Sequence, residues 1–295
     1  MVALPDAGAV LGIDVGCSPA RRSSAACRIA WAAHKVTWKV ARFRAVEPER
    51  TETIVAMAGG GPLACAAFDG PLRPGFGAIG RYRTAERMLT RRLARRIGKP
   101  GASSAPVGIL LNAHANACAR TVLQHCDMPP ATHALPIDDK AVVEAFPSSF
   151  LGVMIDDPST LAARRHNRSD LFFLHWCGRG IFDRIIGHLL PRRRLASDLA
   201  LVSNHDERAA FVCALTALCV AANDYTAVGD HDGWIILPPY ALLQPWARDD
   251  LEANARDEAL RAPTAAATLF RSAGSCELSH ARRAISTRLP SGSRA

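Results

Sequence analysis

Four acidic residues in apolar or turn-forming surroundings constrain the fold of this chain more than any other feature of its sequence. Asp14, Asp69 and Glu144 lie in or at the ends of short apolar runs typical of buried strands, and Asp206 directly precedes a strong helical pattern. An ionised carboxylate in such a place is costly unless a cation compensates it. We therefore expect the fold to bring these carboxylates together around a shared cation, for which a pair of divalent metal ions is the natural candidate.

Each of these residues also has a purely structural explanation. Asp14 and Asp69 are each followed by glycine within two residues, so they could simply accept the hydrogen bonds of a turn. Glu144 could be exposed on an edge strand. Asp206 could cap the helix that follows it, although either residue of the 203–204 pair could cap instead and leave Asp206 facing the sheet. Two strand-end carboxylates in one sheet nevertheless indicate more than either would alone.

The spacing of apolar residues predicts an α/β fold. Strands are expected over 9–14, 25–33, 35–43, 63–69, 142–145 and 234–237. Helices are expected over 47–58, 81–97, 107–126, 180–190 and 207–223, and the stretch 156–178 is expected to be irregular. A strand reached through a helix is normally parallel to a neighbour in the sheet. The fourth strand is therefore expected to run parallel to the first.

The organisation of the chain favours one domain over residues 1–245, with helical insertions at about 73–138 and 156–200. Residues 246–295 are rich in Ala, Arg and Ser and predict a basic, partly disordered tail. The nine cysteines include no Cys-x-x-Cys pair, which argues against a zinc site and favours reduced thiols. No stretch approaches the ~20 apolar residues of a membrane helix. A cytoplasmic protein without a membrane partner is expected.

The charge of the chain favours an anionic partner. Its 295 residues carry a formal net charge of +9, with a sequence pI near 9.4, which is typical of proteins that bind nucleic acid. The arginine-rich stretch 81–97 predicts a basic helix that could hold phosphates, and a solvated helix face with Glu/Arg pairing is the alternative. The candidate nucleic-acid-binding residues are Arg83, Arg87, Arg91 and Arg208.

Five short motifs occur in order along the chain: Gly12-Ile13-Asp14, Phe68-Asp69-Gly70-Pro71-Leu72, Arg81-x-Arg83-x-x-Glu86, Glu144-Ala145-Phe146-Pro147 and His205-Asp206-Glu207-Arg208-Ala209-Ala210. Their ordered combination resembles a domain-of-unknown-function family described as predicted ribonuclease H-like nucleases. The resemblance spans about residues 9–240. It implies a mixed five-stranded sheet of order 3-2-1-4-5 flanked by helices. Where many relatives carry a further Asp in the first turn of the last helix, this chain has Ala209.

This resemblance implies hydrolysis of phosphodiester bonds in DNA or RNA by a two-metal mechanism. Asp14, Asp69, Glu144 and Asp206 would be the catalytic and metal-binding residues, with Asp14 bridging the two ions. Oxygen ligands suit Mg²⁺ or Mn²⁺ better than zinc. Two other classes stay open: an actin-like or sugar-kinase-like nucleotide-binding phosphotransferase, and a non-catalytic scaffold that binds nucleic acid. The sequence leaves the oligomeric state open, with a homodimer among the options.

Overall fold

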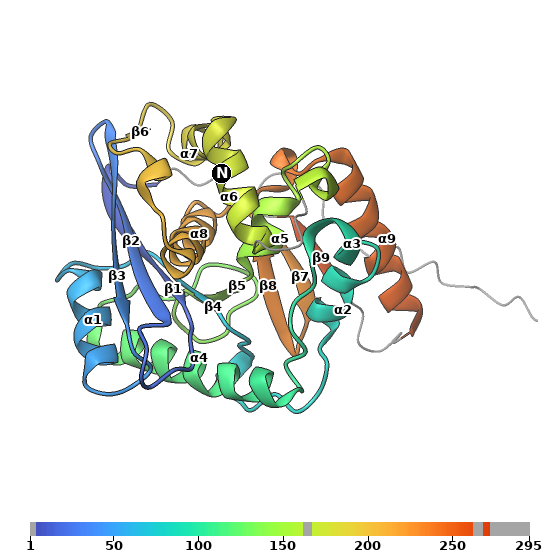
Figure 1. The fold of residues 1–295 in the computed structure, drawn as a ribbon, viewed down its shortest axis with the longest axis horizontal. Coiled ribbons are helices and arrows are strands. Elements are labelled where there is room, and N and C mark those ends of the chain that lie inside the picture. The colour runs from blue at the N-terminus through green and yellow to red at the C-terminus, as the bar shows by residue number, and fades with distance from the viewer. Residues whose placement is uncertain (1–3, 162–166, 262–267, 272–295) are drawn as a thin grey trace, which may run out of the picture.

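A mixed nine-stranded sheet forms the framework of the protein (Figure 1). The computed structural model describes residues 4–161, 167–261 and 268–271. In this part of the chain the strand order is β6-β3-β2-β1-β4-β5-β8-β7-β9. The strands are β1 (Ala7–Asp14), β2 (Ser24–Ala32), β3 (Lys35–Phe43), β4 (Ala66–Asp69), β5 (Val142–Ala145), β6 (Arg194–Leu195), β7 (Thr226–Asp230), β8 (Gly233–Leu237) and β9 (Thr268–Arg271). The predicted α/β class is confirmed.

The centre of the sheet combines an antiparallel and a parallel half. Strands β1, β2 and β3 form an antiparallel meander, while β4 pairs parallel with β1, β5 with β4 and β8 with β5. The sheet exceeds the five strands expected, because β6 extends it beyond β3, and β8, β7 and β9 extend it beyond β5. The carboxyl ends of β1, β4 and β5 therefore meet at one edge of the sheet, as parallel neighbours must.

Helices cover the sheet on both sides. Helix α8 (His205–Ala221) packs across β1, β2 and β4, whereas α1 (Glu49–Ala58) lies on the other side of the meander (Figure 1). The remaining helices are α2 (Thr84–Thr90), α3 (Ala94–Ile97), α4 (Pro106–His125), α5 (Pro147–Gly152), α6 (Arg168–Gly178), α7 (Ile181–Leu189) and α9 (Pro245–Arg261). None of the helices in the described ranges combines the length and apolar character that a membrane crossing requires.

Helix α8 is the central helix of the core. Its sequence predicts an apolar stripe, but every residue from 209 to 220 is buried, so both of its sides are covered. The sheet covers one side, and an aromatic cluster covers the other. In that cluster, Phe211 of α8 packs against Phe173 of α6 and Phe182 of α7, with ring centroids 6.2 and 5.6 Å away. A helix apolar on all sides is buried on all sides.

Two predicted segments differ from the structure. The helix expected over 81–97 is broken between α2 and α3, where Arg92 adopts a left-handed backbone conformation with φ 63°. The stretch 156–178, expected to be irregular, contains α6, whose first turn is capped by the side chain of Asn167. Aromatic residues are modest helix formers. The burial of Phe172 and Trp176 against neighbouring helices stabilises α6 where local propensity does not.

The segment expected to begin a disordered tail is a helix instead. Helix α9 buries Leu251 and Asn254 completely, and it packs against α2. Nδ2 of Asn254 donates to the backbone oxygen of Met88 at 2.7 Å, and its Oδ1 accepts from Arg92 at 2.6 Å. Residues 246–261 therefore belong to the folded domain. Apart from the short strand β9, the rest of the predicted tail, residues 262–267 and 272–295, lies outside the described residues.

Removal of the Asn254 amide should destabilise the whole domain. Asn254→Ala leaves the backbone acceptor of Met88 buried without its donor, which costs about 1–3 kcal/mol. Urea unfolding followed by circular dichroism measures this loss. Arg256→Ala, on the exposed side of the same helix, is the matched control and should leave the free energy of unfolding unchanged. Equal stability of the two variants would show that α9 does not hold α2 in solution.

Candidate active site

Asp14 and Asp69 lie side by side at the carboxyl edge of the sheet. Each is the last residue of its strand, and they are direct partners in the parallel register of β1 and β4. Adjacent strands lie about 4.7–4.9 Å apart, and paired residues point to the same face. The two carboxylates therefore point to the same face of the sheet from neighbouring strand ends, as predicted.

Helix α8 covers this pair closely because β1 carries a glycine beneath it. A Cβ added to Gly12 would lie 1.9 Å from the backbone nitrogen of Ala214 and 2.4 Å from the backbone oxygen of Ala210. Asp14 is two residues further along the strand and faces the same side. Asp206 is one helical turn before Ala210 and faces the sheet in the same way. The close contact at Gly12 thus brings Asp206 towards Asp14.

The N-terminus of α8 also explains why Asp206 is available. Asn204 is the helix cap: its side-chain oxygen accepts from the backbone nitrogens of Asp206 at 2.9 Å and Glu207 at 3.3 Å. This resolves the alternative left open by the sequence, since Asp206 does not cap the helix. Its carboxylate instead accepts a hydrogen bond from Nη2 of Arg42, on β3, at 2.8 Å.

Asp14 and Asp69 are crowded carboxylates, and the positive charge near them is too small to stabilise both in the ionised form. Burial, followed by the negative charges of Asp69 and Asp206, raises the pKa of Asp14 well above its ordinary value. Burial and the charge of Glu144 raise the pKa of Asp69 to about 7. Arg42 opposes the shift at Asp14 but does not cancel it. A bound cation would remove this strain by favouring the ionised forms.

Glu144 does not join the pair, contrary to prediction. In the β4–β5 register it is opposite Phe68, whereas Asp69 is opposite Ala145. Successive residues of a strand point to opposite faces, so Glu144 points away from the face that carries Asp14 and Asp69. It has a structural partner there. Both of its oxygens accept from Arg83 at 2.7 Å, and one also accepts from the backbone nitrogen of Leu72 at 2.8 Å.

Arg83 and Glu144 form the core of a buried ionic network. Arg83 is 2% exposed, and its Nε donates to Glu86 at 2.9 Å, so two carboxylates surround one guanidinium. Burial raises the pKa of Glu144, and the charge and hydrogen bonds of Arg83 oppose that shift. The motif of Arg83, Glu86 and Glu144 therefore connects α2 to β5. Its three side chains hydrogen-bond to one another and are not free to bind a ligand.

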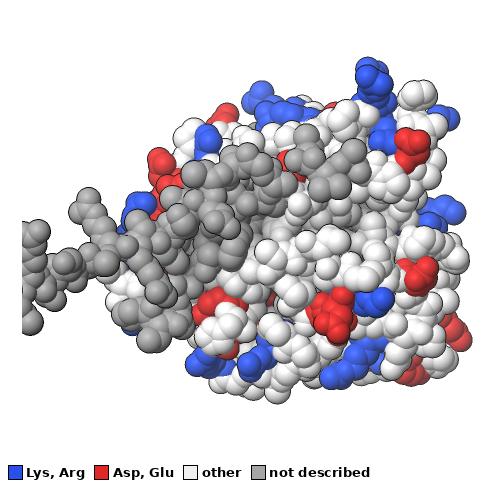
Figure 2. Space-filling model, turned by 180° about the vertical axis from the view of Figure 1, so that it is seen from behind, with Lys and Arg blue, Asp and Glu red and all other residues white. Residues whose placement is uncertain are grey.

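The other predicted phosphate-binding arginines are also engaged within the protein. Arg87 donates to Glu258 at 3.0 Å, and Arg91 pairs with Asp257 at 3.1 Å, so both hold α9 against α2. Arg208 donates to the backbone oxygen of Val202 at 2.8 Å. On the face shown in Figure 2, the described basic side chains are scattered among acidic ones rather than gathered in one patch.

Two residues near the pair were not predicted as a unit. Nδ1 of His205 lies 3.1 Å from Oδ1 of Asp170, at the start of α6, and the same carboxylate lies 3.3 Å from Arg208. The hydrogen bond to Asp170 raises the pKa of His205, and the charges of Asp206 and Asp69 act in the same direction. The adjacency of His205 to Asp206 was visible in the sequence, but Asp170 lay in the stretch expected to be irregular.

The donor set fits one hard cation better than two. Among the described residues, no three His, Cys, Asp or Glu side chains gather as a group that could hold a metal ion. The reason is geometric, because Asp206 is paired with Arg42 and Glu144 lies on the other face. Mg²⁺, however, is commonly held by one or two carboxylates, with water and substrate phosphate completing its shell. Asp14 and Asp69 match that requirement.

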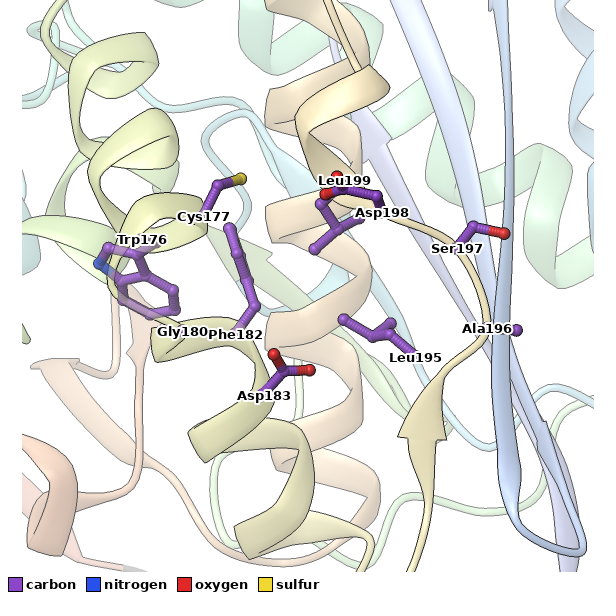
Figure 3. A pocket seen from close by; sticks show the side chains of 10 residues that line it. All are labelled: Trp176, Cys177, Gly180, Phe182, Asp183, Leu195, Ala196, Ser197, Asp198 and Leu199. Carbon is purple, nitrogen blue, oxygen red and sulfur yellow. The ribbon is translucent and has the colours of Figure 1, made fainter.

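A cavity lies beside the buried ionic network of Arg83, Glu86 and Glu144 and reaches the end of β4. It has a volume of about 330 Å³ and is lined by Asp69 and Gly70 at one end and by Pro71, Leu111 and Phe146 along its walls. A different cavity, of about 300 Å³, lies between α6, α7 and the 195–199 segment (Figure 3) and contains none of the four predicted carboxylates. Neither of these two cavities is lined by Asp14 or Asp206, so the register of β1 and β4, rather than a cavity, locates the site.

Comparisons with known proteins do not place this chain in a group. No family model matches it, and no match was found among curated proteins or solved structures. What the site can do therefore follows from the residues themselves. Asp14 and Asp69 offer oxygens that could bind a cation, Asp206 and Arg42 form an ion pair, and the ring of His205 is oriented by Asp170 and Asn167.

Glu144→Gln should destabilise the protein strongly. The substitution weakens the two charge-assisted hydrogen bonds from Arg83, while Glu86 still compensates the guanidinium, so a loss of about 1.5–3 kcal/mol is expected. Thermal melting should fall by about 2–4 °C for each kcal/mol. Glu47→Gln is the matched control, because Glu47 pairs with Arg50 at the surface and should contribute less than about 1 kcal/mol. A melting temperature equal to that of the control would contradict the structural role of Glu144.

In the presence of a metal chelator, Asp14→Asn should stabilise the protein. The folded state resists ionisation of Asp14, so the native protein loses stability as pH rises from about 3.9, the value in the unfolded chain, through the higher folded-state pKa. The substitution removes that loss. It should raise the melting temperature at pH 8 by about 2–4 °C per kcal/mol recovered and change little at pH 4. A lower melting temperature at pH 8 would refute the crowding of the two carboxylates.

Proposed function

We propose that this chain is a metal-dependent nuclease of ribonuclease H-like architecture that hydrolyses phosphodiester bonds in nucleic acid. The observation that carries the proposal is the register pairing of Asp14 with Asp69 at the ends of parallel strands, beneath the first turn of α8. The strand run β3-β2-β1-β4-β5 supports the proposed architecture, since it is the order that the motif resemblance implies. Function rests on the site, because one fold can host many activities.

Asp14 and Asp69 would hold a Mg²⁺ or Mn²⁺ ion, with the substrate phosphate completing its coordination. Such an ion supplies Lewis-acid activation of the phosphate and lowers the pKa of a bound water. We place Asp206 as the carboxylate available to a second ion, which requires Arg42 to release it. Glu144 has no part in this arrangement. The metal-dependent hydrolysis would therefore use Asp14, Asp69 and Asp206, without Glu144.

Arg42 and His205 are the groups through which the protein would act on the phosphate. Arg42 is 36% exposed at its side chain and already contacts a carboxylate of the site, so a phosphate oxygen is an alternative acceptor for its guanidinium. The hydrogen bond between Nδ1 of His205 and Asp170 fixes the orientation of the imidazole ring. The positive charge of His205 lowers the pKa of Asp69. Nε2 of the ring lies 2.9 Å from the side-chain amide of Asn167, so both ring nitrogens have partners and His205 would act on the phosphate through the electrostatics of the site.

The charge distribution along the chain supports nucleic acid as the substrate. Residues 262–295 contain five arginines and one glutamate, so they contribute +4 of the formal net charge of +9. The remaining +5 is carried by residues 1–261. Binding through such a distribution releases counterions from the phosphate backbone. Affinity should therefore fall steeply with salt, as it does for proteins that contact several phosphates.

A cleavage assay with the purified full chain tests the proposal. Single-stranded and duplex DNA and RNA should be cut in Mg²⁺ or Mn²⁺ and left intact in chelator. Asp14→Asn should slow cleavage by about 100-fold or more, which is the scale of losing one electrostatic contact to a transition state. Asp183→Asn, an exposed carboxylate of α7, is the control and should cut at the wild-type rate.

Two outcomes would decide against a nuclease. Binding of the oligonucleotides without metal-dependent cleavage would favour a non-catalytic scaffold. Equal cleavage rates for Asp14→Asn and the control would show that the activity arises elsewhere, whether in another site or in a contaminant.

A further inference from the structure

The end of the sheet formed by β2, β3 and β6 carries basic side chains without acidic ones (Figure 1). These three strands contain no Asp or Glu, whereas β3 contributes Lys35 and Lys39, and β6 begins at Arg194. The parallel register places Arg194 directly beside Lys35. Register partners point to the same face of a sheet, and so do residues an even number of positions apart in one strand. Lys35, Lys39 and Arg194 therefore share one face.

The segment that carries Arg194 is fixed to the sheet by the arginine before it. Nε of Arg193 donates to the backbone oxygen of Ala33, in the turn between β2 and β3, at 3.1 Å. The backbone nitrogen of Arg194 donates to the backbone oxygen of His34, in the same turn, at 3.1 Å. The side chains of Arg192 and Arg194 take no part in these contacts and are exposed. The chain is thus held in place while two of three consecutive guanidinium groups face solvent.

Four of the cations at this end have no role in holding the protein together. Within the described residues, the exposed side chains of Lys35, Lys39, Arg192 and Arg194 have no hydrogen-bond or ion-pair partner. The arginines predicted from the sequence to bind phosphate are, in contrast, all bonded within the protein. Four unpaired cations compare with a net charge of +5 for the whole of residues 1–261. We call the surface formed by these four residues the β3–β6 basic face.

The β3–β6 basic face suits a partner that is bound through charge alone. None of the large apolar side chains exposed in the described part of the chain belongs to β2, β3 or β6, so this surface offers no apolar anchor for a lipid layer. Trp38 of β3 packs edge-to-face against Phe211, with ring centroids 6.1 Å apart, and therefore provides no platform for a stacked base. The partner has to supply negative charge without apolar or aromatic contacts.

The spacing of the cations matches a repeating series of negative charges. Lys35 and Lys39 are four residues apart, which is about 13 Å along a strand, and Arg194 is one inter-strand spacing of about 4.8 Å from Lys35. Nucleic acid presents phosphates at regular intervals along its whole length. Contacts of this kind position a nucleic acid without reading its sequence.

We infer that the β3–β6 basic face binds the phosphate backbone of nucleic acid, independently of sequence. Asp14 shares a face of the sheet with Arg42, because both are register partners of Ala25. Lys39 is three residues before Arg42 and therefore points to the opposite face. The basic face is thus separate from the carboxylate pair. The inference goes beyond the proposed function, since it concerns binding and holds whether or not the protein cleaves.

The test removes two neighbouring cations and compares them with two cations elsewhere. Lys35→Gln/Arg194→Gln removes register partners of the basic face. Arg179→Gln/Arg184→Gln is the matched control, because both arginines are exposed, lack a partner among the described residues and change the net charge equally. Fluorescence anisotropy of a labelled DNA duplex, measured with the full chain in chelator from about 50 to 200 mM salt, gives the slope of log association constant against log salt.

We expect the slope to become shallower by about 2 in Lys35→Gln/Arg194→Gln, since each lost phosphate contact removes about 0.9. Lys39→Gln alone should make it shallower by about 1. Arg179→Gln/Arg184→Gln should keep the wild-type slope, and so should Lys35→Arg/Arg194→Lys, which retains both charges. A duplex of unrelated sequence should give the same slopes. Melting temperatures should equal that of the wild type, because the side chains removed are exposed and unpaired.

A wild-type slope in both Lys35→Gln/Arg194→Gln and Lys39→Gln would overturn the inference. An equal change in the control would also overturn it, because net charge rather than this surface would then set the affinity. Binding to vesicles of equal parts phosphatidylserine and phosphatidylcholine that is lost in the double variant, with the DNA slope unchanged, would assign the face to a membrane instead. A protein that cleaves nothing but shows the selective slope change retains this surface and loses only the nuclease assignment.

Discussion

The contact between helix α8 and strand β1 at Gly12 determines the geometry of the candidate site. With no side chain at that position, the backbone of the helix approaches the strand so closely that a single added carbon would overlap Ala214. The first turn of α8 therefore lies directly over the ends of β1 and β4. Asp206 comes close enough to raise the pKa of Asp14 for this reason, and the strand register supplies the second carboxylate.

Two arginines perform different electrostatic tasks around this geometry. Arg83 is buried and compensates two carboxylates, which connects α2 to the sheet and removes Glu144 from any role at the surface. Arg42 is partly exposed and compensates only Asp206, leaving the Asp14 and Asp69 pair with unsatisfied negative charge. Buried pairs of the first kind stabilise structure, since breaking them is costly. Exposed pairs of the second kind contribute little stability and can exchange partners.

The sequence was informative wherever local pattern decides the structure. The strand ends at Asp14 and Asp69, and the helix that makes their strands parallel, could all be predicted from apolar runs and their breaks. The position of Glu144 could not, because a shift of one residue in register moves a side chain to the other face, and β5 is buried on both faces, so its apolar pattern does not distinguish them. The ion pair of Arg87 with Glu258 joins residues 171 positions apart. Helix α9 has no apolar stripe from which its packing against the domain could be predicted. Such contacts are decided by tertiary packing alone.

The docking of α9 on α2 has a consequence for how the chain is made. Residues near position 88 can find their partners only after residues near position 254 have left the ribosome. Strands β7 and β8 likewise reach the sheet late in synthesis, although β5, on which β8 docks, ends at Ala145. During translation the β5 edge therefore stays unpaired until the segment between β5 and β8, residues 146–232, has been made. Exposed edges of this kind invite pairing with other chains. The order of synthesis therefore leaves the β5 edge open to mispairing for longer than the edges within the meander.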